Sequence, residues 1–103
     1  MILSDANEVY IHEILEGYGL SQYVDRVITN KGYWEECDGK FVLRIQPYHC
    51  NRTCKLCPRN LCKGEVLTSL IDEGWSQGGA ILYVGDGGGD FCPVTRMREV
   101  CGI

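Results

Sequence analysis

A chain of 103 residues is long enough for one small domain, and its 10 basic and 14 acidic side chains give it a net charge of −4. Such a domain buries roughly 60–65% of the surface of its unfolded chain, so a core is possible. The acidic balance, without a basic stripe, argues against nucleic acid as a partner, and no apolar run reaches the ~18 residues of a membrane span. The first residues lack the pattern of a signal peptide. We therefore expect a soluble, cytoplasmic protein that binds neither nucleic acid nor a membrane.

The N-terminal part of the chain predicts a strand, a helix and a second strand. The run "ILSD" at residues 2–5 is β-like and leads into small polar residues, which cap helices or bind anions at a helix N-terminus. Between residues 8 and 18, apolar side chains recur at helical spacing, and glycines follow as a stop signal. The stretch "YVDRVITN" at residues 23–30 predicts the second strand.

The rest of the chain predicts a hairpin, a cysteine-rich loop, a helix and a last strand. In "WEECDGKFVLRI" (34–45), Asp38-Gly39 separates two alternating segments, which is the strongest short-range signal for a β-hairpin. The stretch "CKGEVLTSLIDEGW" (62–75) has apolar residues on one helical face and a glycine past its end. The continuous apolar run "AILYVGD" (80–86) is typical of a buried strand.

This alternation of strands and helices predicts an α/β domain built on a parallel sheet, with residues 1–103 forming a single domain. In open α/β sheets, ligands bind just beyond the carboxyl ends of the strands. Two of the predicted strands, 2–5 and 80–86, end there in polar loops. These two loops are therefore the first candidates for a binding site.

The second of these loops, "GDGGGD" at residues 85–90, suggests a magnesium site. Asp86 and Asp90 offer oxygen ligands, which magnesium prefers, and phosphate and water would complete the coordination of the ion. The glycines let the backbone turn sharply and approach a ligand closely. A solvated turn with two acidic residues is the other interpretation of this loop when it is taken alone.

Three separated stretches, taken together, resemble the motifs of a known superfamily. "ILSDAN" (2–7), "NLCKGEVL" (60–67) and "YVGDGGGDFCP" (83–93) are similar, in this order, to the second, third and fourth motifs of the haloacid dehalogenase superfamily. More narrowly, "SDAN", "RIQPYH", "CxxCPxNxCK" and "GDGxxDFCP" resemble the phosphoethanolamine/phosphocholine phosphatase family, whose relatives include pyridoxal phosphate phosphatases. The resemblance implies a partial Rossmann-like core of parallel strands with a β-hairpin and a cysteine-rich loop. It also implies a magnesium-dependent phosphatase of small phosphomonoesters such as phosphocholine, phosphoethanolamine or pyridoxal phosphate.

The resemblance assigns six residues to the catalytic and substrate-binding site, which are Ser4, Asp5, Asn7, Lys63, Asp86 and Asp90. Ser4 would hydrogen-bond the transferred phosphoryl group, and Lys63 would neutralise the phosphate and the nucleophile. The two aspartates of the glycine-rich loop would hold magnesium, while Asp5 and Asn7 would border the substrate. Phosphoryl transfer depends mainly on positioning and on stabilising charge, for which a hydroxyl, an ammonium and a divalent cation are suited. Taken alone, Ser4 can also be a helix cap and Lys63 an exposed lysine at a helix start.

Two features of the chain depart from the family pattern. The family often has asparagine before the second aspartate of its fourth motif, whereas this chain has Gly89, which predicts the loss of a side-chain contact. Superfamily members begin with a DxD segment, whose first aspartate is the nucleophile and whose second acts as acid and base; these 103 residues contain none. The resemblance then implies that the central strand with the nucleophile and the substrate-selecting cap are absent. We expect a fragment, a truncated gene model or a degenerate copy that is inactive alone.

The cysteine-rich loop holds a second candidate site. Cys54 and Cys57 form a CxxC pair, Cys62 follows, and His49 lies upstream, which matches the Cys3His ligand set of structural zinc. The spacing between Cys57 and Cys62 is short for zinc-finger ligand pairs, and Cys50 is a competing ligand. The alternative is that these cysteines pack as small apolar groups in the loop that presents the motif lysine. Four further residues are expected to pack or to lie at the surface: Cys37, Cys92, Cys101 and His12.

Three function classes stay open from the sequence. The first is the phosphatase that the resemblance implies, with a small phosphorylated metabolite as its partner. The second is a zinc-stabilised binding module without catalysis. The third is an inert remnant that binds another chain.

Overall fold

The computed structural model describes the backbone of residues 1–101 and the side chains of residues 1–99. The chain forms two compact units. The N-terminal unit comprises Met1–Cys50 and Arg59–Leu61, and the C-terminal unit comprises Asn51–Pro58 and the chain from Cys62 onward. Most of the cysteine-rich loop therefore belongs to the C-terminal unit.

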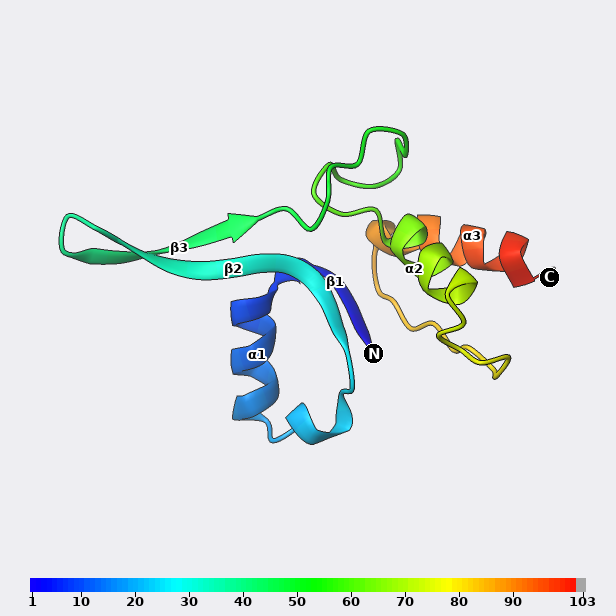
Figure 1. Cartoon of the computed structure of the whole chain (residues 1–103), viewed down its shortest axis with the longest axis horizontal. Coiled ribbons are helices and arrows are strands. Elements are labelled where there is room, and N and C mark those ends of the chain that lie inside the picture. Colours follow the sequence, from blue (N-terminus) through cyan, green and yellow to red (C-terminus); the bar gives the residue numbers. More distant parts are fainter. Residues whose placement is uncertain (102–103) are drawn as a thin grey trace. The chain divides into compact units, whose positions relative to one another are not determined.

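The N-terminal unit is a three-stranded mixed sheet with one helix against it (Figure 1). Its elements in chain order are β1 (Ile2–Asn7), α1 (Glu8–Gly17), the short 3-10 helix η1 (Ser21–Tyr23), β2 (Val27–Cys37) and β3 (Lys40–Gln46). The strand order is β1-β2-β3, in which β1 and β2 run parallel and β2 and β3 antiparallel. The predicted α/β class and its parallel pair are confirmed, although the sheet is mixed rather than wholly parallel.

Helix α1 begins and ends at local signals that the sequence displays. The Asn7 side chain accepts a hydrogen bond from the Tyr10 backbone N–H at 3.0 Å, so Asn7 is the N-cap. Gly19, just after the helix, has a positive φ of 66°, a conformation that glycine adopts at little cost. Helix α1 packs closely on β2, because a Cβ at Gly32 would lie only 3.0 Å from the Val9 side chain. The predicted helix is confirmed.

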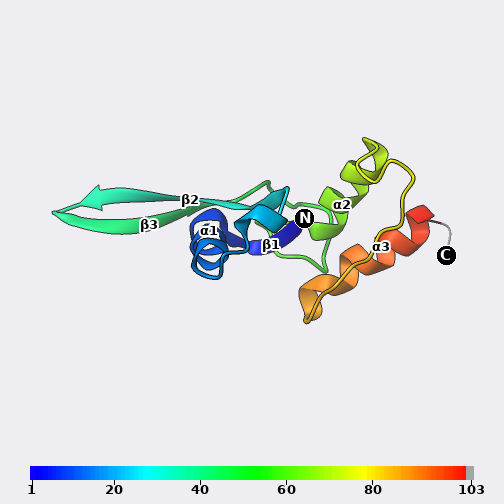
Figure 2. The same cartoon turned by 90° about the horizontal axis from the view of Figure 1, so that it is seen from below.

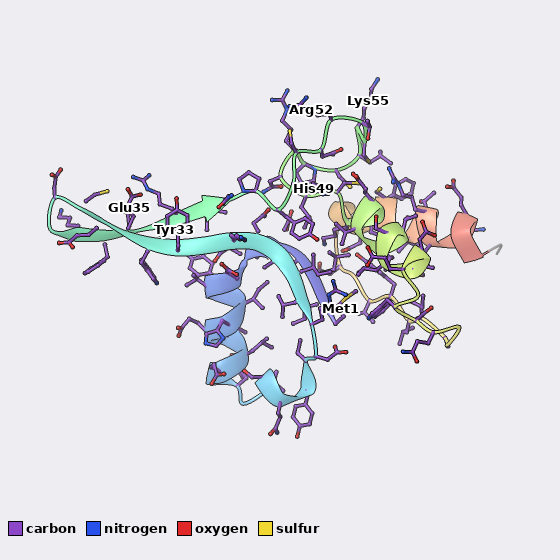
Figure 3. The ribbon with its side chains drawn as sticks, in the orientation of Figure 1. Met1, Tyr33, Glu35, His49, Arg52 and Lys55 are labelled. Carbon is purple, nitrogen blue, oxygen red and sulfur yellow. The ribbon has the colours of Figure 1, made fainter. Side chains whose placement is uncertain are left out.

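Strand β2 is longer than predicted because it also forms the first arm of the hairpin. It begins at Val27 rather than at residue 23, since η1 occupies residues 21–23. Asp38 and Gly39 have positive φ values of 51° and 77°, the conformation that a two-residue type I′ turn requires. The predicted hairpin is therefore confirmed. Figures 2 and 3 show it extending away from α1, with Tyr33 and Glu35 on its β2 arm.

The C-terminal unit is helical. It contains α2 (Lys63–Asp72), the short 3-10 helix η2 (Gly88–Asp90) and α3 (Phe91–Cys101), and α2 and α3 lie side by side (Figures 1 and 2). Val66, Leu67 and Leu70 share one face of α2 and are buried, as their helical spacing predicts. Among the described residues, no helix combines the length and the apolar character that a membrane span requires.

The prediction of a buried strand at residues 80–86 is wrong for this structure. The segment has no strand conformation, and Leu82 and Val84 are 89% and 85% exposed. A continuous apolar run becomes a buried strand only when neighbouring strands take up its backbone hydrogen bonds and other elements cover its faces. The described residues of the C-terminal unit include no strand that could do so. The segment instead forms an irregular connection to the glycine-rich loop.

Candidate functional site

Lys63 and Asp90 are brought together at the N-terminal ends of two helices. Lys63 is the first residue of α2, and Asp90 ends η2 directly before α3. Lys63 Nζ lies 3.0 Å from Asp90 Oδ1, and the two side chains are only 15% and 14% exposed. Lys63 is therefore an enclosed, ion-paired residue rather than a solvated lysine at a helix start.

Four donors hold the Asp90 carboxylate. Its Oδ1 accepts hydrogen bonds from Lys63 Nζ at 3.0 Å and from the Tyr83 hydroxyl at 2.6 Å. Its Oδ2 accepts from the backbone N–H groups of Asp86 and Gly87, at 3.0 and 3.1 Å. A carboxylate offers about four lone-pair positions, so these donors fill them. Asp90 thereby fixes the lysine, the tyrosine and the glycine-rich loop relative to one another.

Tyr83 is a site residue that the motifs do not single out, because it lies inside an apolar run. The sequence holds one signal, since a tyrosine within an apolar run and close to an acidic loop needs a partner for its hydroxyl when it is buried. The Tyr83 hydrogen bond, followed by those of Lys63 and the Gly87 N–H, holds the pKa of Asp90 well below its usual range, although burial acts in the opposite direction. Burial, followed by the contact with Asp90, raises the pKa of Tyr83 above its usual range. At neutral pH, Asp90 is thus an anion and Tyr83 a neutral donor.

The glycine-rich loop approaches Asp90 closely, as its composition predicts. A Cβ at Gly85 would overlap the Asp90 carboxylate, so this approach requires glycine. Gly87, in contrast, faces open space. At Gly89, where the family often has asparagine, a Cβ would lie 3.9 Å from Lys63 Nζ. An asparagine side chain at this position would therefore lie beside Lys63.

Asp86 and Asp90 differ in how readily they could hold a magnesium ion. The Asp86 side chain is exposed on the loop, where an ion can reach it. The Asp90 oxygens already accept four hydrogen bonds, so Asp90 would bind an ion only by exchanging one of its donors. Two carboxylates beside a backbone that a ligand can approach closely are still the oxygen-donor set that magnesium prefers. The residues present fit the ion, with Asp86 as the more accessible ligand.

Ser4, Asp5 and Asn7 lie at the end of β1, in the N-terminal unit, whereas the lysine and the two aspartates belong to the C-terminal unit. Ser4 is not the helix cap; its hydroxyl accepts a hydrogen bond from the Ala6 N–H at 3.1 Å. The fully buried Asn30 donates to the carbonyl groups of Asp5 and Ala6 at 2.9 and 3.0 Å. Asn30 therefore fixes the backbone of this loop, a role that spacing along the chain does not reveal. Asn7 is buried, while Ser4 is half-buried and Asp5 exposed.

A separate cluster gathers four thiols within the C-terminal unit. They lie within 4.8 Å of one another, measured between the Sγ atoms of Cys54, Cys57, Cys62 and Cys92. Cys92 belongs to this set, although the sequence predicts only a packing or surface thiol there, and His49 does not belong to it. Thirty positions separate Cys92 from Cys62, so no local spacing could have linked them. The predicted thiol of Cys101 lies outside the described side chains.

The environment of the cluster changes the acidity of its thiols. Burial raises the pKa of Cys57 and of Cys92 above the usual value for a thiol. Burial acts in the same direction on Cys54, but hydrogen bonds from the Leu56 N–H and from the Cys92 thiol outweigh it and lower the pKa of Cys54 to about 7. Cys54 therefore becomes a thiolate, the form that binds metals and reacts, more readily than Cys57 or Cys92.

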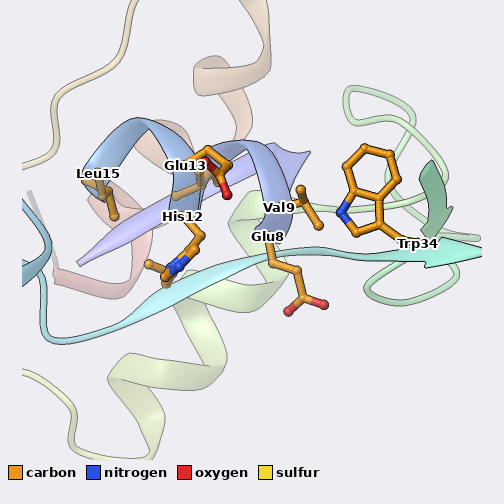
Figure 4. A pocket seen from close by; sticks show the side chains of 8 residues that line it. Glu8, Val9, His12, Glu13, Leu15 and Trp34 are labelled. Atoms are coloured by element: carbon orange, nitrogen blue, oxygen red, sulfur yellow. The ribbon is translucent and has the colours of Figure 1, made fainter. Parts of the chain in front are cut away.

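A cavity of about 490 Å³ lies beside α1 and β2 (Figure 4). Its wall combines apolar side chains, such as Trp34, with the polar side chains of Glu8, His12 and Glu13. His12 is exposed, as predicted. The described lining contains two carboxylates and neither lysine nor arginine, so its charge does not suit a phosphate ester. The cavity is therefore not the phosphate site that the motifs predict.

Comparison with known proteins agrees with the motifs. A family described as "Putative Phosphatase" matches residues 1–101. The chain belongs to this phosphatase family. It is 42% identical to a thiamine phosphate phosphatase-like protein of Arabidopsis thaliana over 95% of the chain, and 39% identical to human pyridoxal phosphate phosphatase PHOSPHO2 over 96% of the chain. It is also 36% identical, over 94% of the chain, to inorganic pyrophosphatase 1 of Arabidopsis thaliana.

These matches confirm the resemblance to the haloacid dehalogenase-type, pyridoxal phosphate phosphatase-like family. No solved structure matches the chain. The chain spans 41% of the length of the first two relatives and 34% of the length of the pyrophosphatase. Membership of the phosphatase family is thus established for a segment that corresponds to less than half of each relative.

Proposed function

We propose that this chain is part of a magnesium-dependent phosphatase that acts on a small phosphomonoester such as pyridoxal phosphate, phosphocholine or phosphoethanolamine. The observation that carries the proposal is the enclosed Lys63 ammonium, which Asp90 holds at 3.0 Å beside a loop that also carries Asp86. An ammonium paired with one carboxylate, with a second carboxylate exposed on the same loop, suits a phosphate group and a divalent cation together. The names of the relatives, pyridoxal phosphate phosphatase among them, support the same class of reaction.

The C-terminal unit would supply positive charge to the phosphate. Lys63 would neutralise the phosphate oxygens and the nucleophile, and Asp90 would keep the ammonium in place. Asp86, together with Asp90, would hold magnesium, which supplies further charge to the phosphate oxygens when it is bound. Tyr83 is a neutral donor to Asp90 and therefore helps to position the lysine rather than to transfer a proton.

The motif that ends β1 assigns residues to the phosphoryl group and the substrate. The half-buried Ser4 hydroxyl would donate to the transferred phosphoryl group, and the exposed Asp5 carboxylate would border the substrate. The buried Asn7 caps α1, so it would act by holding the loop in place. These assignments follow the motifs and are open to test by substitution.

The nucleophile is not assigned to any residue of this chain. The 103 residues contain no DxD segment, and the groups described above stabilise charge rather than attack phosphorus. We therefore propose that the isolated chain does not hydrolyse phosphomonoesters and that turnover requires a DxD segment in addition. The substrate of the phosphatase to which this chain would contribute is a small phosphorylated metabolite.

A chimera tests this proposal. Residues 1–103 replace the matching segment of human pyridoxal phosphate phosphatase, and hydrolysis of pyridoxal phosphate and p-nitrophenyl phosphate is measured with and without magnesium. We expect magnesium-dependent turnover by the chimera and none by the isolated chain. Lys63→Met should lower kcat/KM of the chimera by about 100- to 1,000-fold. Lys31→Met, a change of an exposed lysine on β2, is the matched control and should leave kcat/KM unchanged.

Two results would contradict the assignment of this chain to a phosphatase with Lys63 in its site, and a third would contradict the proposed inactivity of the isolated chain. One is a chimera that is folded by circular dichroism but inactive while the parent enzyme is active. The other is a Lys63→Met chimera that retains the activity of the unsubstituted chimera. Magnesium-dependent turnover by the isolated chain would instead reveal a nucleophile within it, and a nucleophile scan of its serines and aspartates would then identify the residue.

A further inference from the structure

We propose that Cys54, Cys57, Cys62 and Cys92 bind one zinc ion as a tetrahedral site of four thiolates. The ion would join the cysteine-rich loop to the starts of α2 and α3, all within the C-terminal unit. Four protein ligands leave no open position for a substrate, so the site is structural. The inference rests on these cysteines and their neighbours and does not depend on phosphatase activity.

The distances between the sulfur atoms suit a zinc ion. With zinc–sulfur bonds of about 2.3 Å, tetrahedral geometry places each pair of sulfur atoms about 3.8 Å apart. Cys92 Sγ lies 3.6 Å from Cys54 Sγ and 3.9 Å from Cys62 Sγ, and all four sulfur atoms lie within 4.8 Å of one another. An ion at the centre of the cluster can therefore contact each sulfur after small side-chain adjustments.

The buried Asn51 organises the loop that carries the first two ligands. Its Nδ2 donates hydrogen bonds to the carbonyl groups of Cys54, Cys57 and Pro58, at 2.9, 3.2 and 3.1 Å. Its Oδ1 accepts a hydrogen bond from the Cys54 N–H at 3.0 Å. The loop thus curls around one side chain and brings both CxxC sulfur atoms into the cluster. The exposed Arg52 and Lys55 come from this same loop (Figure 3).

The surroundings of the cluster also suit four thiolates better than four packed thiols. Four thiolates and one Zn²⁺ carry a net charge of −2, which needs donors or cations nearby. The backbone N–H groups of Leu56 and Cys57 favour negative charge on the Cys54 sulfur, and the Arg96 side chain lies at the same cluster, beside Gly64 and Cys92 Sγ. Donors of this kind orient metal ligands and stabilise their charge. Thiols that pack only as small apolar groups carry no negative charge that a guanidinium at the edge of the cluster could stabilise.

Gly64, the second residue of α2, leaves room for this arrangement. A Cβ there would lie 2.6 Å from Cys92 Sγ and 2.8 Å from the Cδ atom of Arg96. Glycine is among the least favourable residues within a helix, so its presence here is explained by the close approach of the sulfur and the arginine. Three elements therefore converge on the proposed ion: the loop, the start of α2 and the start of α3.

Zinc at this cluster would hold the motif residues in place as well as the loop. Cys62 directly precedes Lys63, and Cys92 follows Asp90 by two residues. One ion would therefore hold in place the starts of both helices that form the ion pair. The proposed ion would thereby help to keep the lysine and the aspartate at a fixed distance.

Metal analysis of the reduced 103-residue chain, purified without chelator, tests the site directly. We expect one zinc per chain that survives dialysis. After exchange for Co²⁺, we expect the visible and charge-transfer absorption of a tetrahedral four-thiolate site. A reduced chain that is folded by circular dichroism but binds neither metal, or a cobalt spectrum with fewer thiolate ligands, would overturn the proposal.

Variants distinguish this site from the set that spacing along the chain suggests. Cys92→Ser should lose the stoichiometric zinc, whereas His49→Ala and Cys50→Ser should each keep one zinc per chain with unchanged affinity. Arg96→Met keeps all four ligands and should weaken zinc binding by about 10- to 100-fold, which keeps the proposal testable if Cys92→Ser does not fold. Zinc that is retained by Cys92→Ser and lost by His49→Ala would refute the assignment. An inactive chimera that still binds one zinc would contradict the proposed phosphatase function but not the proposed zinc site.

Discussion

Replacing Asp90 by asparagine removes the negative charge that Lys63 faces while it keeps the shape of the side chain. The asparagine can still offer one oxygen, but its NH2 group then faces donors that need an acceptor. In the native chain, that carboxylate accepts from the lysine, from the Tyr83 hydroxyl and from two backbone N–H groups of the glycine-rich loop. The substitution therefore leaves one ammonium without its counterion and at least one donor without a partner.

The structure sets the expected size of this effect. Removing one partner of a buried ion pair costs about 3–5 kcal/mol, because the remaining charge is uncompensated. Lys63 is 15% exposed and keeps part of its hydration, which reduces the cost. Hydrogen bonds to a charged acceptor contribute about 1.5–3 kcal/mol each. The loss of the hydrogen bonds from the loop therefore increases the cost of the substitution. We expect Asp90→Asn to lower the free energy of unfolding by about 3 kcal/mol, a large share of the roughly 5–15 kcal/mol typical of a domain.

Urea unfolding of the reduced chain at neutral pH, followed by circular dichroism, measures this loss. Asp86→Asn is the matched control, because it makes the same chemical change four residues away in the same loop, at an exposed side chain. We expect it to change the free energy of unfolding by at most about 0.5 kcal/mol. Equal losses for the two variants, or a loss below about 1 kcal/mol for Asp90→Asn, would refute the reasoning that Asp90 anchors the loop.

Four further predictions concern the same chain and the same unfolding assay. The pKa of Asp90 is held below the usual value of about 3.9, so its contribution to stability is complete above that pH and is lost as the pH falls through the lower pKa of the folded state. Urea midpoints should therefore fall more steeply in acid for the native chain than for Asp90→Asn, and parallel curves would contradict this. Gly85→Ala should cost about 1–3 kcal/mol because its Cβ would overlap the Asp90 carboxylate, whereas Gly87→Ala, which faces open space, should be nearly neutral; the reverse order would count against the close approach. Asn30→Ala should cost about 2–4 kcal/mol, since it removes two donated hydrogen bonds and one accepted bond at a fully buried site. Thr29→Val should be neutral or stabilising, because the Thr29 hydroxyl is buried without a hydrogen-bond partner among the described residues; a destabilised variant would indicate a partner for it.

The features that the sequence determined by itself are those set by residues close together in the chain. Asp38-Gly39 specifies the hairpin turn because few residues accept a positive φ at two successive positions. Asn7 and the helical spacing that follows it specify α1, since a cap and its first turn lie within four residues. The motif lysine and the glycine-rich loop could be identified in the same way, from short stretches that resemble a phosphatase family to which the chain belongs.

Tertiary structure determined the conformation of residues 80–86. Their apolar character indicates that the segment can be buried, but a strand also needs hydrogen-bond partners on neighbouring strands. Those partners come from other parts of a protein, so a single run of residues cannot contain that information. In the described part of the C-terminal unit no strand offers them, and the apolar side chains of Leu82 and Val84 remain exposed.

The partners within each site were likewise decided by folding. Tyr83 is the donor to Asp90 because the irregular segment approaches the Asp90 carboxylate closely at Gly85, and Cys92 joins the cysteine cluster because α3 starts beside α2. Spacing along the chain pointed to His49 as the fourth ligand, since it is close to Cys54 in sequence. Periodicity and spacing report which residues share one element or one loop. A hydrogen-bond partner or a metal ligand is selected by distance in space, which depends on how separate elements pack against one another.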